Sequence, residues 1–165
     1  MGQYGRKFKF LKFRSMYVNN DATIHREYVK CFIANANGGG QTPEGRSAYK
    51  LTADPRVTPI GAFLRKTSLD ELPQFANVLK GDLSLVGPRP SLPYEVECYM
   101  MWHRARLLSA KPGITGVWQV GGRSRVKFDD MVRMDLRYAA SWSLWLDIKI
   151  LLRTPYAVLL GNGAH

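Results

Sequence analysis

The chain has 165 residues, of which 24 are Lys or Arg and 13 are Asp or Glu, so its formal net charge is +11. That length suits one domain over residues 1–165, and 45 % apolar with 22 % charged residues excludes a disordered chain. Two scattered cysteines argue against a structural zinc site, and no run of about 18 uncharged apolar residues is present to span a bilayer. The positive charge favours an anionic partner, a class that includes nucleic acid, anionic lipid and phosphorylated substrates.

The first third of the chain predicts a strand, a helix and a loop. Residues 6–18 alternate aromatic and basic side chains before their register shifts, which favours a short strand with a basic face. Residues 21–36 predict a helix that Asp21 caps and that has its apolar residues on one side. The composition of residues 37–47, NGGGQTPEGRS, is typical of a loop.

Helices predominate in the rest of the chain. A short helix is predicted within 57–66, and a second follows from apolar residues at i, i+3, i+4 and i+7 over 72–79, with Gly81 as its stop. Three prolines and a glycine exclude a regular helix over 83–93. The pattern then predicts a helix over 95–108, a turn, strand and turn over 111–124, and a helix over 128–140.

Residues 143–160, SLWLDIKILLRTPYAVLL, form the most lopsided predicted element. Three charged residues make this segment too polar and too short to span a membrane. Trp, Leu and Ile with intermittent charge suit a helix that lies in a membrane interface. The alternative is a core helix broken at Pro155, because apolar stripes usually face a core.

Two adjacent carboxylates, Asp70 and Glu71, lie at or near a predicted helix start within TSLDELP. The unpaired N–H groups and the positive dipole end there favour ionised carboxylates. An ionised Asp is a usable nucleophile toward phosphorus, and its neighbour can bind a divalent cation through hard oxygen. Ser68 and Glu71 also have the spacing of a capping box, so simple capping is the alternative to catalysis.

Basic residues and turn formers surround this pair in the sequence. Arg65 precedes it, Arg89 follows within Gly-Pro-Arg-Pro, and Lys12 and Arg14 lie in the first basic segment. Arginine grips phosphate oxygens in bidentate fashion, and clustered positive charge offsets the charge of a transferring phosphoryl group. The alternative for any one of these residues is a solvated surface position.

Other candidates have a structural interpretation. Trp118 and Gln119 lie between glycines, where the aromatic ring stacks on a base or fills core, with core favoured. His103 within Trp-His-Arg is a base or, by preference, structural. No P-loop, G-x-S-x-G or H-E-x-x-H pattern is present in the sequence.

Taken together, these segments resemble the bacterial sugar transferase family, the monotopic phosphoglycosyl transferases that start glycoconjugate synthesis. The resemblance runs from about Gly2 to the C-terminus and is most specific in its long central block. The matching strings are KFRSM at 12–16, DPRVTPIGAFLRKTSLDELPQFANVLKGDLSLVGPRP at 54–90, KPGITGVWQVGGRS at 111–124 and MDLRYAASWSLWLDIKILLRT at 134–154.

The resemblance implies a mechanism. Asp70 attacks the β-phosphate of a UDP-sugar, releases UMP and forms a covalent phospho-sugar enzyme. A polyprenyl phosphate, typically undecaprenyl phosphate, then accepts the sugar phosphate to start exopolysaccharide, capsule or O-antigen synthesis. Glu71 is implied to hold Mg²⁺, and Arg65, Arg89 and Lys12 are implied to contact phosphate.

The resemblance also implies a place in the cell, at the cytoplasmic face of the bacterial inner membrane, with an anionic membrane surface as partner. It favours an interfacial role for part of 143–160. The family has an upstream hydrophobic helix that is missing here, so the chain is expected to be a catalytic domain truncated at its N-terminus. The sugar is left open, and so is a homodimer.

The expected fold is α+β, a mostly helical domain with a few short strands and amphipathic membrane-surface helices. A Rossmann sheet is not expected. Two rival functions exist: a nucleic-acid-binding module, which the charge alone suggests and for which no groove-reading motif exists, and a membrane-surface protein without catalysis.

Overall fold

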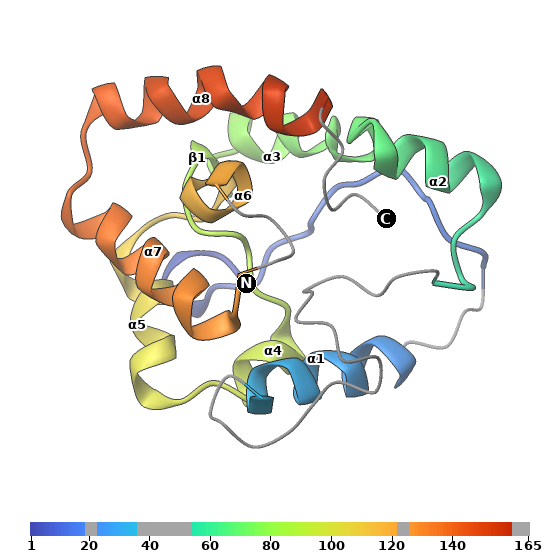
Figure 1. The fold of residues 1–165 in the computed structure, drawn as a ribbon, viewed down its shortest axis with the longest axis horizontal. Helices are drawn as coiled ribbons and strands as arrows, with labels where there is room; N and C mark the ends of the chain where they lie inside the picture. The colour runs from blue at the N-terminus through green and yellow to red at the C-terminus, as the bar shows by residue number, and fades with distance from the viewer. Residues whose placement is uncertain (19–22, 36–53, 122–125, 160–165) are drawn as a thin grey trace.

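The computed structural model describes residues 1–18, 23–35, 54–121 and 126–159. This part of the chain is mostly helical, with one small sheet (Figure 1). The eight α-helices in these ranges are α1 (Thr23–Asn35), α2 (Pro59–Lys66), α3 (Gln74–Leu79), α4 (Pro93–Glu97), α5 (Met101–Ser109), α6 (Val117–Gly121), α7 (Phe128–Ala140) and α8 (Leu144–Leu159). Two 3₁₀ turns, η1 (Gln3–Gly5) and η2 (Leu69–Glu71), complete the helical elements. The predicted fold class is confirmed.

The sheet consists of two short parallel strands, β1 (Ser84–Val86) and β2 (Gly113–Thr115), with Ser84 opposite Gly113 and Val86 opposite Thr115. α4 and α5 form the crossover that a parallel pair requires. Just beyond β1, the backbone at Gly87 lies so close to Gly113 that a Cβ on Gly113 would be 2.2 Å from the Gly87 nitrogen. The two glycines therefore let the strand ends meet.

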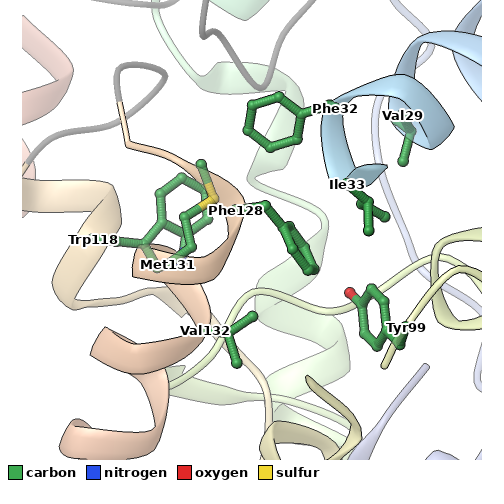
Figure 2. Close-up of a cluster of buried hydrophobic side chains, with 8 residues drawn as sticks. All are labelled: Val29, Phe32, Ile33, Tyr99, Trp118, Phe128, Met131 and Val132. Atoms are coloured by element: carbon green, nitrogen blue, oxygen red, sulfur yellow. The ribbon is translucent and has the colours of Figure 1, made fainter. Parts of the chain in front are cut away.

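The main core lies between α1, the α4–α5 corner, α6 and α7 (Figure 2). Phe128 is at its centre, with its ring centroid 5.3 Å from that of Tyr99 and 6.3 Å from that of Phe32. Phe128, Met131 and Val132 are spaced i, i+3 and i+4, so α7 turns one face inward. That strong periodicity explains why the predicted bounds of this helix are confirmed.

Several sequence predictions need correction. Residues 6–18 form no strand; this segment is extended, and its ladder contact is one isolated bridge between Met16 and Val57. Its backbone hydrogen bonds go to other elements instead: the Phe13 N–H donates to the Asp70 carbonyl oxygen at 2.9 Å and the Leu11 N–H to Asn77 Oδ1 at 3.0 Å. The predicted turn after β2 is the helix α6, and the helix predicted over 95–108 divides into α4 and α5.

Other sequence predictions hold or fall outside the described ranges. The helices predicted within 57–66 and over 72–79 are confirmed as α2 and α3, and Gly81 follows α3 with a φ of +81°. The helix over 21–36 is confirmed as α1. The Asp21 cap and the loop at 37–47 lie outside the residues that the structure describes.

α8 is not broken at Pro155, because it continues through that proline to Leu159. Ile150 is buried against Val86 and Tyr138, whereas Trp145 and Leu152 are 62 % and 73 % exposed. Asp147 holds the helix in place, since Oδ1 accepts a 2.7 Å hydrogen bond from the Tyr138 hydroxyl. No helix among the described residues is long and apolar enough to cross a membrane.

Candidate active site

The two predicted catalytic carboxylates lie on η2, a single 3₁₀ turn between α2 and α3. Ser68 opens this turn in the left-handed conformation, with φ 57° and ψ 16°, which is a strained backbone for serine. The Ser68 side chain makes no capping hydrogen bond, so the capping-box alternative is wrong. The turn presents Asp70 inward and leaves Glu71 partly exposed.

Asp70 is buried, with a side-chain exposure of 3 %, and lies next to Lys12. The Lys12 ammonium is 2.7 Å from Asp70 Oδ2 and 3.7 Å from Glu71 Oε1. Among the described residues, Oδ2 accepts no hydrogen bond of good geometry, so the contact with Lys12 is mainly a charge pairing. A buried carboxylate oxygen that no hydrogen bond engages, next to a cation, suits a nucleophile that attacks an anionic centre.

The extended N-terminal segment delivers Lys12 to this point. Asn77, on α3 and buried, donates to the Lys9 carbonyl oxygen at 2.7 Å and accepts the Leu11 N–H. The Phe13 N–H bonds to the backbone of Asp70 itself. Lys12 is therefore fixed between two backbone anchors.

A cavity of about 100 Å³ adjoins the dyad on the Glu71 side. Arg89 contributes to its wall, so the structure brings Glu71 and Arg89, two sequence-predicted site residues, to one pocket. The other residues around it are Met1, Phe8, Phe10, Gln74, Pro90, Ser91, Leu92, Gly113, Ile114 and Gln119. Cation, carboxylate, amide and aromatic groups together suit a ligand with both phosphate and neutral polar parts.

Arg65 takes a different position. It lies in the last turn of α2, and its Nε donates a 2.9 Å hydrogen bond to Ser15 Oγ on the segment that carries Lys12. It is absent from the residues that line the cavity. Its predicted phosphate contact stays a prediction.

Sequence reasoning missed the aromatic and amide residues of the cavity, above all Phe8, Phe10 and Gln74. Gln74 follows Glu71 by three residues, and this spacing was the available signal, because i and i+3 share a helix face. Trp118 is a core residue, as favoured, whereas its neighbour Gln119 lines the cavity.

His103 is structural and lies outside the cavity. It is fully buried, its Nδ1 accepts the Met100 N–H at 3.1 Å, and its Nε2 lies 3.0 Å from Asp129 Oδ1. Since Nδ1 accepts, the neutral ring carries its proton on Nε2 and donates to Asp129. Burial lowers the pKa of His103, and the hydrogen bond with Asp129 partly opposes that shift.

The donor set fits a magnesium ion but does not form a closed protein site. No group of three or more His, Cys, Asp or Glu side chains gathers within the described ranges. Mg²⁺ commonly uses one or two carboxylates and completes its shell with water and substrate phosphate oxygens. Glu71, 40 % exposed at the cavity and beside Asp70, supplies such a carboxylate.

Comparison with known proteins identifies the class. The model of the bacterial sugar transferase family matches residues 1–161, and the chain belongs to this family. The galactosyl transferase CpsE of Streptococcus agalactiae is 47 % identical over 170 residues, which cover 99 % of this chain and 34 % of that protein. The undecaprenyl-phosphate galactose phosphotransferase of Salmonella typhimurium is 46 % identical over 165 residues, which cover 100 % of this chain and 33 % of that protein.

The chain thus spans about a third of the length of these two curated relatives. It covers 70 % of a shorter one, the exopolysaccharide production protein ExoY of Sinorhizobium fredii, to which it is 41 % identical over 165 residues and over 100 % of its own length.

Proposed function

We propose that this chain transfers a sugar 1-phosphate from a UDP-sugar to a polyprenyl phosphate, in particular undecaprenyl phosphate. The observation that carries the proposal is the buried Asp70 carboxylate, 2.7 Å from the Lys12 ammonium, beside a cavity that Glu71 and Arg89 line. The names of the Salmonella relative and of a 38 % identical Escherichia coli relative, a UDP-glucose:undecaprenyl-phosphate glucose-1-phosphate transferase, support the choice of donor and acceptor.

In the first step, a carboxylate oxygen of Asp70 attacks the β-phosphorus of the donor. The bond between that phosphorus and the oxygen that bridges to the α-phosphate breaks, and UMP leaves with the bonding pair. The product is an acyl phosphate that links Asp70 to the sugar phosphate. Lys12 and Arg89 offset the negative charge on the phosphoryl oxygens, the largest electrostatic demand of such a transfer.

In the second step, a phosphate oxygen of the polyprenyl phosphate attacks the same phosphorus. The Asp70–phosphorus bond breaks, the carboxylate is restored, and a polyprenyl diphosphate sugar leaves. Asp70 is the nucleophile of the first step and the leaving group of the second, so donor and acceptor follow a ping-pong order. Glu71 would hold Mg²⁺, which supplies charge neutralisation at the phosphates when bound.

The exposed apolar side chains suit a protein that meets its lipid acceptor at a membrane surface. Phe63 on α2, Leu79 on α3 and Trp145 and Leu152 on α8 are exposed. α2, α3 and α8 lie along the same edge of the molecule in Figure 1. Apolar side chains on helices beside basic ones favour binding to an anionic interface, and we place the protein at the cytoplasmic face of the bacterial inner membrane.

The test is UMP release from a panel of UDP-sugars with Mg²⁺ and undecaprenyl phosphate in detergent. Asp70→Asn, which keeps the shape of the side chain, should reduce release at least 1000-fold, because the nucleophile contributes most of such a rate. Release that depends on Asp70 and acceptor supports the transferase and identifies the sugar. Equal activity of the variant contradicts the role of Asp70.

If neither the wild type nor a version extended to the length of the shorter relatives releases UMP, the rival function, a membrane-surface protein without catalysis, is favoured. Tight DNA or RNA binding with a steep salt dependence would favour the other rival.

A further inference from the structure

A buried ion pair contacts the backbone of Arg89, one of the residues that line the cavity. Arg106 on α5 is 5 % exposed and Asp135 on α7 is 2 % exposed, and Arg106 Nη2 is 2.7 Å from Asp135 Oδ2. The same Nη2 donates a 3.1 Å hydrogen bond to the carbonyl oxygen of Arg89. Neither Arg106 nor Asp135 lines the cavity.

Stability alone does not account for this pair. Removing two charges from water costs several kcal/mol per ion, and well-packed apolar residues in their place are often as stable or more stable. The pair is held between α5 and α7, where the neighbouring α7 positions Met131 and Val132 show that apolar packing is available. The presence of the Arg106–Asp135 pair is therefore explained by the group that the Arg106 guanidinium holds.

What it holds is the turn that presents Arg89. The flanking contacts fix this turn at other points: the Pro88 carbonyl oxygen accepts the Gly113 N–H at 2.9 Å, and Ser91 Oγ accepts the Tyr99 hydroxyl at 2.9 Å. Arg106 supplies the contact at Arg89 itself. The peptide of Arg89 is thus anchored by Arg106, while Arg89 lines the cavity and its Nη1 lies 3.7 Å from Glu95 Oε1.

We propose that Arg106 and Asp135 are positioning residues that orient the Arg89 peptide so that its guanidinium meets the phosphates of the donor. The inference rests on the proposed function. Asp135 orients Arg106, Arg106 holds the carbonyl oxygen of Arg89, and Arg89 contacts the donor. A displacement of the Arg89 guanidinium by about 1 Å is enough to weaken a phosphate contact strongly.

The test is a double-mutant cycle between Arg106→Met and Arg89→Ala. Methionine keeps the length and apolar stem of Arg106 and removes its charge and donors. The dissociation constant of UDP-sugar is measured with the Asp70→Asn substitution also present, so that the donor binds without turnover. UMP release is measured on the same variants with Asp70 intact. We expect Arg106→Met to weaken binding and lower kcat/KM by about 10- to 100-fold.

In the Arg89→Ala background, Arg106→Met should have less than a twofold further effect, because the group it positions is gone. A purely structural residue would lower the melting temperature without this coupling. Equal losses in both backgrounds would overturn the inference.

The matched control is Arg133→Met, which removes an arginine from an exposed pair on α7, 3.2 Å from Asp130. It should leave binding and release unchanged. Where Arg106→Met does not fold, Asp135→Asn replaces it in the cycle, since it keeps the shape of the side chain and removes the negative charge that orients Arg106. If the wild type binds UDP-sugar but the effects of the two substitutions are additive, this inference alone is overturned. If the wild type neither binds UDP-sugar nor releases UMP, the proposed function is overturned with it.

Discussion

Gln74 is a buried residue that lines the cavity. It is 2 % exposed, and its amide atoms are not among the fully buried side-chain N and O atoms that lack a hydrogen-bond partner. An amide that borders a cavity can exchange a water molecule for a polar group of the donor sugar or base when the donor binds.

Gln74→Leu should therefore impair donor use with little change in stability. We expect the free energy of unfolding to change by less than about 1.5 kcal/mol, because leucine is of similar size. UMP release at low UDP-sugar concentration should fall at least tenfold, since the donor loses a hydrogen bond. Urea unfolding and initial rates measure the two effects, and a variant with unchanged rates contradicts the role of Gln74.

At the next scale, individual elements differ in how far the sequence determines them. α7 is predictable because its apolar positions follow one helical face and its neighbours add to that preference. The structure of segment 6–18 is not predictable in this way, because its hydrogen-bond partners, Asp70 and Asn77, lie some 60 residues away in the sequence. The segment bonds to the backbone carbonyl of Asp70 and to the side chain of Asn77, and not to a neighbouring strand. Local alternation carries no information about such partners.

The residues of the candidate site likewise differ in how far the sequence predicts them. The dyad and Arg89 follow from motifs, and the structure brings Glu71 and Arg89 to one cavity. Phe8, Phe10 and Arg106 depend on the packing of distant elements, so no local pattern identifies them.

α8 gives a prediction at the scale of the element. Trp145→Ser combined with Leu152→Ser removes two exposed apolar side chains and one contact on the same helix, between the Trp145 ring and the Lys149 ammonium 5.5 Å from its centroid. Binding to anionic vesicles, followed by sedimentation, should fall at least tenfold, because apolar burial in the interface contributes about 25 cal/mol per Å². The free energy of unfolding in solution should change by less than about 0.5 kcal/mol.

Ile150→Ala is the contrasting variant on the same helix. Ile150 is 3 % exposed and packs on Val86 and Tyr138, so its truncation should cost about 2–5 kcal/mol of stability. Vesicle binding of the folded fraction should be unaffected. The reverse pattern, with vesicle binding sensitive to Ile150 and not to Trp145, would mean that α8 meets the membrane with its other face or not at all.

For the molecule as a whole, charge and apolar surface act together. The net charge of +11 attracts anionic lipid over a distance that salt shortens, and the exposed apolar side chains act only on contact. Under the proposed function, the same positive charge also attracts phosphorylated substrates. Raising the ionic strength therefore weakens approach to the membrane while the buried Arg106–Asp135 pair is screened much less.

The stability of the whole fold should depend on pH through His103, which is in the main core with its ring centroid 5.0 Å from that of Phe128. Burial lowers the pKa of His103 in the folded state below the ordinary value of 6.5, so the unfolded chain binds the proton more readily. The charged and titratable groups that act on the ring are Asp129, which raises its pKa, and Arg106, which lowers it. The contribution is therefore fully present above pH 6.5 and is lost as the pH falls below that value.

His103→Gln should remove this dependence, because the amide keeps a donor toward Asp129 and does not titrate. Urea unfolding between pH 7.5 and pH 5 should show a stability gap between the wild type and the variant that narrows on acidification. Burial raises the pKa of Asp135 to about 6, so the folded state binds the proton first there and stability rises as the pH falls from about 6 toward 4. Since both proteins share Asp135, this opposing contribution cancels in the gap. A gap that is constant with pH would show that the His103 ring takes its proton as readily in the folded protein as in the unfolded chain.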